Sequence, residues 1–140
     1  MNRKVALQTL MLLTLAALLA GCGTPGAGTR LDGTSWVLTS LNGSRPLEGV
    51  PVTLVFEDGE VSGSASCNSY FGAYTVEGAD ELTFSGIGST LMACLEPEGI
   101  MDQEVQYLET LGAAASFRLS DGELQLYSAG GGLLVFSRAE

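Results

Sequence analysis

The chain has 140 residues and a formal net charge of −10, from 16 acidic and six basic side chains, and it contains no histidine. Without histidine, neither Ser-His nor Cys-His nucleophile pairs nor histidine metal sites can be built, so we expect no enzyme, no catalytic residues, no metal and no cofactor. The length suits one compact domain, and the acidic excess disfavours nucleic acid as a partner.

The N-terminal segment is typical of a secretory signal peptide. Arg3 and Lys4 precede an apolar run, residues 5–19, that is too short to span a bilayer. The ending Leu19-Ala20-Gly21-Cys22 resembles the lipobox of bacterial lipoproteins. This resemblance implies a signal peptide over residues 1–21 and attachment to a membrane of the cell envelope through palmitate-type acyl chains on Cys22. It leaves open which membrane, inner or outer, and the alternative is an ordinary signal peptide.

Residues 22–33 follow as a predicted flexible tether, because glycine, threonine, proline and alanine dominate and nothing in the segment is expected to pack. The folded domain is expected over residues 34–138. Without residues 1–21 the chain keeps four basic side chains, all arginine, against 16 acidic ones. Because anionic headgroups would repel this acidic domain, we expect a covalent lipid to attach it to the membrane.

Short runs of alternating apolar and polar residues, separated by Asn-Gly or Asp-Gly, predict antiparallel β-hairpins. The turn pairs are Asn42-Gly43, Asp58-Gly59 and Asp121-Gly122, and the runs beside them are residues 36–41, 52–57, 117–120, 123–127 and, at the end, 133–137. We expect a mainly β fold, a barrel-like curved antiparallel sheet of about eight strands. Its interior is expected to be filled by aromatic side chains, namely Trp36, Phe56, Phe84, Phe117 and Phe136.

One segment has helical periodicity. Pro97 suits a first helical position, and the pattern predicts one α-helix over residues 97–111 covering one opening of the barrel. Its apolar face is expected to carry Met101, Val105, Leu108 and Leu111, with Asp102, Gln103, Gln106 and Glu109 opposite.

Three cysteines are present, and lipidation of Cys22 would leave the pair Cys67 and Cys94. In an exported protein such a pair can oxidise, which predicts a disulfide. The alternative is two buried free thiols.

Three ordered motifs resemble the META domain, a family that includes HslJ-like envelope lipoproteins. They are Cys67-Asn68-x-Tyr70-x-Gly72-x-Tyr74, Thr90-x-Met92-Ala93-Cys94, and Met101-x-Gln103-Glu104-x-x-Tyr107-Leu108-x-x-Leu111. The resemblance implies an antiparallel barrel-like fold with one helix, frequent export, and a link in some members to stress or drug tolerance, without a settled activity. Ser66 departs from the family, where glycine is common, and is tolerated unless that position needs a positive φ angle.

The motif residues are interpreted as structural rather than as a ligand site. Asn68 is expected to bond to backbone at a strand bend, and Gln103 and Glu104 to tie the helix to the sheet. Tyr70, Gly72 and Tyr74 are expected on one strand face. We therefore expect a monomeric, non-enzymatic, lipid-anchored envelope domain that binds a protein or supports envelope stress tolerance. A small-molecule carrier and a protease inhibitor are the alternatives.

Overall fold

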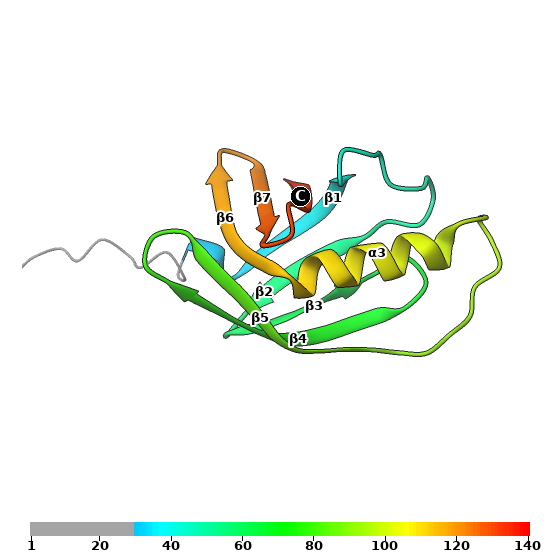
Figure 1. Ribbon diagram of the computed structural model, residues 1–140, viewed down its shortest axis with the longest axis horizontal. Coiled ribbons are helices and arrows are strands. Elements are labelled where there is room, and N and C mark those ends of the chain that lie inside the picture. The colour runs from blue at the N-terminus through cyan, green and yellow to red at the C-terminus, as the bar shows by residue number, and fades with distance from the viewer. Residues whose placement is uncertain (1–29) are drawn as a thin grey trace, which may run out of the picture.

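Eight strands form a closed antiparallel barrel in chain order, and one helix packs across one end of it, in a computed structural model that describes residues 30–140 (Figure 1). The predicted mainly β fold with one helix is confirmed. The predicted signal peptide, Cys22 and most of the tether lie outside the described residues. The elements are β1 (Thr34–Leu41), β2 (Thr53–Glu57), β3 (Glu60–Ser64), β4 (Ser69–Glu77), β5 (Glu81–Ser89), α3 (Ile100–Gly112), β6 (Ala114–Ser120), β7 (Glu123–Ser128) and β8 (Leu133–Arg138).

The tight turns lie where the sequence predicts them. Asn42 and Asp58 have φ angles of 50° and 51°, and the glycine after each is also positive, at 86° and 82°. Two successive residues with positive φ match the right-handed twist of a hairpin, which explains the Asn-Gly and Asp-Gly pairs. Gly122, at 81°, makes the turn between β6 and β7.

The barrel has one weak joint, between β5 and β6. These strands pair in register only at Glu81 and Ser116, and the Phe117 N–H donates to the Asp80 carbonyl at 2.8 Å. Helix α3 packs against β5 on this side, and its Tyr107 and Leu111 are fully buried in the core. Gln103 and Glu104 of the helix also bond to Leu47 and Asn68, which lie in loops at one end of the barrel. The helix therefore covers this opening, as predicted.

Aromatic side chains fill the barrel as predicted. Trp36, Phe56 and Phe136 are fully buried, and Phe84 and Phe117 are 9% and 4% exposed. Burial of a large aromatic side chain removes about 150–250 Å² from water, so these rings dominate the core.

The packed domain starts earlier than residue 34. Leu31 is fully buried in the core, and Asp32 Oδ1 accepts a hydrogen bond from the Asp58 N–H at 2.7 Å. The prediction that nothing in the tether up to Gly33 packs is thus wrong at its C-terminal end. A single leucine among glycines gives no periodicity from which its burial could be read.

Helix α3 corrects two further predictions. It begins at Ile100 rather than at Pro97, after Gly99 with a φ angle of 85°. Its buried residues are Ile100, Glu104, Tyr107 and Leu111, whereas Val105, predicted to pack, is 53% exposed. The helix is rotated from the predicted orientation because Glu104, although charged, finds hydrogen-bond donors inside the protein.

Candidate functional site

The carboxylate of Glu104, only 4% exposed, joins α3 to the segment between β3 and β4. Its Oε2 accepts the N–H groups of Cys67 and Asn68 at 3.1 and 2.7 Å. Its Oε1 accepts the side-chain amide of Asn68 at 2.6 Å. A buried charge is tolerated only when it is hydrogen-bonded in this way.

Asn68 in turn fixes the chain that leaves β5. Its Oδ1 accepts the Thr90 hydroxyl and the Met92 N–H, both at 2.7 Å. Its Nδ2 also donates to the Met92 carbonyl at 3.0 Å. The prediction that Asn68 bonds to backbone is confirmed, and Thr90 and Met92 owe their place in the motif to these bonds.

A disulfide joins Cys67 to Cys94, whose Cα atoms are 5.9 Å apart. The disulfide prediction is confirmed, and the alternative of two free thiols is wrong. The Cys94 N–H also points to Met101 Sδ at 3.5 Å. Residues 90–99, which we call loop 90–99, are thus attached to the barrel through Asn68 and Cys67 and to the helix through Met101.

Gln103 ties the same end of the helix to the barrel, as predicted. Its Nε2 donates to the Ser66 hydroxyl at 2.7 Å, and its Oε1 accepts the Leu47 N–H at 2.7 Å. Together with Glu104 it locks α3 onto two segments distant in sequence.

Ser66 has a φ angle of 105°. A positive φ angle strains any residue with a Cβ atom, so serine is less favourable here than the glycine common in the family. Its hydroxyl nevertheless accepts the bond from Gln103. We expect Ser66→Gly to change the free energy of unfolding little, because relief of strain offsets the lost hydrogen bond. Ser66→Ala keeps the strain and loses the bond, so it should be less stable than Ser66→Gly by about 1 kcal/mol. Urea unfolding of both variants measures the difference, and equal stabilities would contradict a strained φ angle.

The motif tyrosines lie on one face of β4. The hydroxyls of Tyr70 and Tyr107 are 2.7 Å apart, and Tyr70 also donates to the Thr53 carbonyl at 2.8 Å. Tyr74 is buried and donates to Asp32 at 3.3 Å. Gly72, between them, makes room for Ile87 rather than for a ring, since an added Cβ would lie 2.6 Å from Ile87 Cδ1.

Burial raises the pKa of both Tyr70 and Tyr107 well above the ordinary value of 10.0, and in Tyr107 the neighbouring Tyr70 adds to the rise. The folded state therefore favours the protonated phenols. Their contribution to stability is complete below about pH 10 and is lost as the pH rises above it. We expect phenolate absorbance from this pair only together with loss of near-ultraviolet circular dichroism. Ionisation of the pair in a protein that stays folded at pH 11 would contradict the tight burial.

Three large apolar side chains of loop 90–99 face solvent. Leu91 is 96% exposed, Leu95 is 87% exposed and Met92 is 58% exposed. Sequence reasoning treated Met92 only as a structural motif residue and did not single out the two leucines. The available signal was the absence of charged residues between Thr90 and Glu96 in a segment that belongs to no predicted strand or helix.

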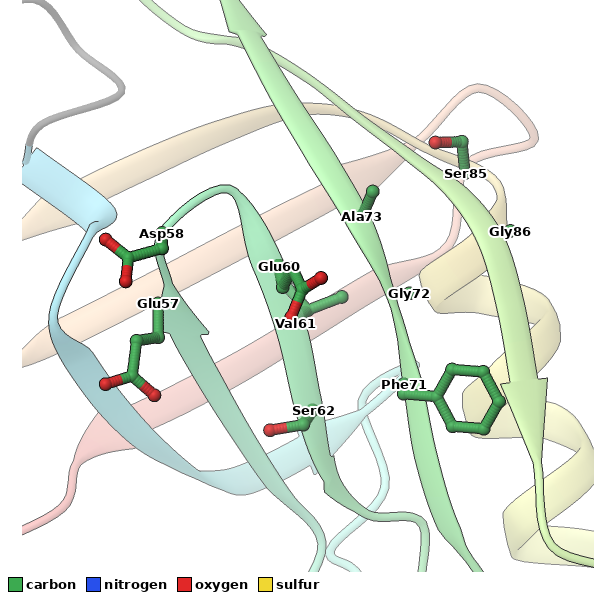
Figure 2. A pocket seen from close by; sticks show the side chains of 10 residues that line it. All are labelled: Glu57, Asp58, Glu60, Val61, Ser62, Phe71, Gly72, Ala73, Ser85 and Gly86. Carbon is green, nitrogen blue, oxygen red and sulfur yellow. The ribbon is translucent and has the colours of Figure 1, made fainter.

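A hollow of about 500 Å³ lies on the outer face of β3, β4 and β5 (Figure 2). Gly72, Gly86, Glu60 and Phe71 are among the residues that line it, and Figure 2 shows Glu60 between Asp58 and Phe71. Figure 2 shows Glu57 and Asp58 pointing away from Phe71, so the acidic groups do not converge on one point. Within residues 30–140 no group of three or more His, Cys, Asp or Glu side chains is placed to hold a metal ion.

The chain is therefore a small mainly β domain, a closed barrel whose helix is held in place by a buried glutamate and a buried asparagine. The chain belongs to the META domain family, whose sequence pattern matches residues 29–140. No curated protein matches the chain.

Solved structures share the fold. A protein from Burkholderia xenovorans, solved by NMR, is 29% identical with a TM-score of 0.65, over 86% of this chain and 93% of that one. A second NMR structure is 26% identical with a TM-score of 0.64, over 79% of this chain and 92% of that one. A DUF4847-family protein from Bacteroides vulgatus, at 14% identity and a TM-score of 0.62, covers 80% of this chain and 96% of its own and shows the fold alone.

Proposed function

We propose that this protein is an HslJ-like, lipid-anchored envelope protein whose META domain acts without catalysis, as a monomer, by binding another envelope protein through loop 90–99. The observation that carries the proposal is the exposure of Leu91, Met92 and Leu95 on a loop that is held in place. A role in stress tolerance would follow from the identity of that partner.

Exposed apolar side chains that cluster on a fixed segment are typical of interaction sites. The disulfide and the bonds of Asn68 hold the backbone of this loop before any partner arrives. Less conformational entropy is then lost on binding, which favours affinity.

The alternatives have less support. A carrier needs an apolar cavity for its ligand, but the barrel interior is occupied by Trp36, Phe56 and Phe136. An active site needs polar groups free to meet a substrate, but the Glu104 carboxylate is engaged by the donors of Cys67 and Asn68. No specific feature favours protease inhibition.

The anchor rests on the sequence pattern that ends at Cys22. No helix within residues 30–140 is long and apolar enough to span a bilayer. We expect wild-type protein in the membrane fraction and Cys22→Ser in the soluble fraction after cell breakage. Sedimentation of Cys22→Ser with membranes would contradict lipidation, and separating inner from outer membranes would locate the anchor.

The binding role is tested by placing a photo-crosslinking amino acid at Leu95 in living cells, with Thr83 as the matched control. Thr83 is exposed on the outer face of β5, away from loop 90–99. We expect a discrete adduct with an envelope protein from position 95 and none from position 83. No adduct from position 95, or the same adduct from both positions, would overturn the proposed function.

A further inference from the structure

We propose that loop 90–99 binds a cationic amphipathic segment of its partner, one that presents aliphatic side chains between lysines or arginines. This inference rests on the proposed function and names the chemistry of the partner. It is carried by the juxtaposition of exposed apolar and exposed acidic side chains in one short, fixed segment.

The apolar part of the surface lies at one end of the barrel. Thr90 N–H donates to the Ser69 carbonyl at 3.0 Å, so Leu91 and Met92 start beside the first residue of β4. Phe71, 61% exposed, lies two residues along the same strand, and its ring covers Gly88. A partner that covers Leu91, Met92 and Leu95 would remove most of their apolar area from water, at about 25 cal/mol per Å².

The charged side chains of loop 90–99 itself are acidic, although Arg45 lies beside Gly99 and Asp102 at the start of the helix. Glu96, Glu98 and Asp102 are exposed and directly follow the apolar residues. From Thr90 to Gly112 the chain contains no lysine or arginine. A basic partner is favoured, because its charges would meet these carboxylates and the excess negative charge of the whole domain would steer it.

A second copy of the chain fits this surface less well. In a symmetric dimer the same patch meets itself, so Glu96 and Glu98 would approach a partner surface that is also acidic. Like charges placed opposite each other oppose association.

A membrane fits less well too. The chain enters the domain at Asp32, next to Tyr74, whereas loop 90–99 lies beside Ser69, five residues away along β4 and about 17 Å distant at the usual rise per residue. Figure 1 shows the start of the described chain, in blue, and the segment between β5 and α3 at opposite ends of the domain. The proposed lipid anchor therefore does not require loop 90–99 to touch the bilayer, and anionic headgroups would repel Glu96 and Glu98.

The test measures binding of a synthetic helical peptide of leucine and lysine, with a shuffled peptide of equal composition as the reference, to exported protein carrying Cys22→Ser. We expect the amphipathic peptide to bind at least ten-fold more tightly than the shuffled one. Leu91→Ser with Leu95→Ser should remove that preference. Both residues are exposed, so thermal melting should show these variants folded.

Charge is tested separately by Glu96→Lys with Glu98→Lys. The matched control is Glu77→Lys with Asp80→Lys, an equal change of net charge at exposed positions of the β4–β5 turn. We expect the first pair to weaken peptide binding at least ten-fold and the control pair less than three-fold.

Equal losses in both pairs would show non-specific attraction to an acidic protein and overturn the inference. Loop-dependent binding to phosphatidylglycerol vesicles, or loop-dependent dimerisation in sedimentation, without preference for the amphipathic peptide would also overturn it. If the crosslink from Leu95 persists while the peptide preference is absent, the proposed function stands and only the cationic partner is wrong.

Discussion

Replacing Glu104 by alanine is expected to lower the free energy of unfolding by about 4 kcal/mol, because the N–H groups of Cys67 and Asn68 and the Asn68 amide would lose their acceptor in a buried place. A loss of this size would lower the melting temperature by roughly 15 °C in a domain of this length. Thermal melting followed by circular dichroism measures it.

Two further variants make the test specific. Glu104→Gln keeps one acceptor oxygen but turns an amide N–H toward a donor, so we expect a loss of about 2 kcal/mol. Glu109→Ala removes an exposed carboxylate from the same helix and should change stability by less than about 0.5 kcal/mol. A Glu104→Ala protein as stable as Glu109→Ala would show that the buried carboxylate does not hold the helix to the barrel.

Replacing Cys67 and Cys94 together by alanine is expected to lower the free energy of unfolding by about 3.5 kcal/mol. The two cysteines are 27 residues apart, and closing a loop of that length restricts the unfolded chain by about this amount. Denaturant unfolding of the oxidised wild type and of the double variant measures the difference.

The double variant should stay folded in the absence of denaturant, because Asn68 and Glu104 still join the same segments. Reductant should lower the stability of the wild type to that of the variant and leave the variant unchanged. If reductant has no effect on the wild type, the cysteines are not paired in the exported protein.

The elements that follow from local chemistry were predictable from the sequence. Asn42-Gly43 and Asp58-Gly59 mark turns because few other pairs adopt positive φ angles at two successive positions. The barrel aromatics, such as Trp36 and Phe136, occupy every second position of short β-type runs, and successive side chains of a strand point to opposite faces.

The rest depends on contacts between distant segments. Glu104 lies on the buried face of α3 because the N–H groups of Cys67 and Asn68, about 36 positions earlier in the chain, donate to its carboxylate. The periodicity of the helix sequence cannot reveal such distant donors. Leu31 is buried by strands that follow it. For the exposure of Leu91 and Leu95 the sequence held only a weak signal, a run without charged residues outside any predicted strand or helix, and such a run can equally be covered.

Strands β5 and β6 pair over only one position, so the bonds that hold α3 to the barrel also affect the tendency of the protein to aggregate. If α3 separated from the barrel, β5 beyond Glu81 and the facing edge of β6 would have unpaired N–H and C=O groups, available to a strand from another molecule. If the proposed anchor holds the protein on a membrane, neighbouring copies would meet at high local concentration, where edge-to-edge pairing is fast. In a protein so anchored, the Glu104 and Asn68 bonds and the nearby disulfide would oppose polymerisation through the sheet, in addition to stabilising the fold.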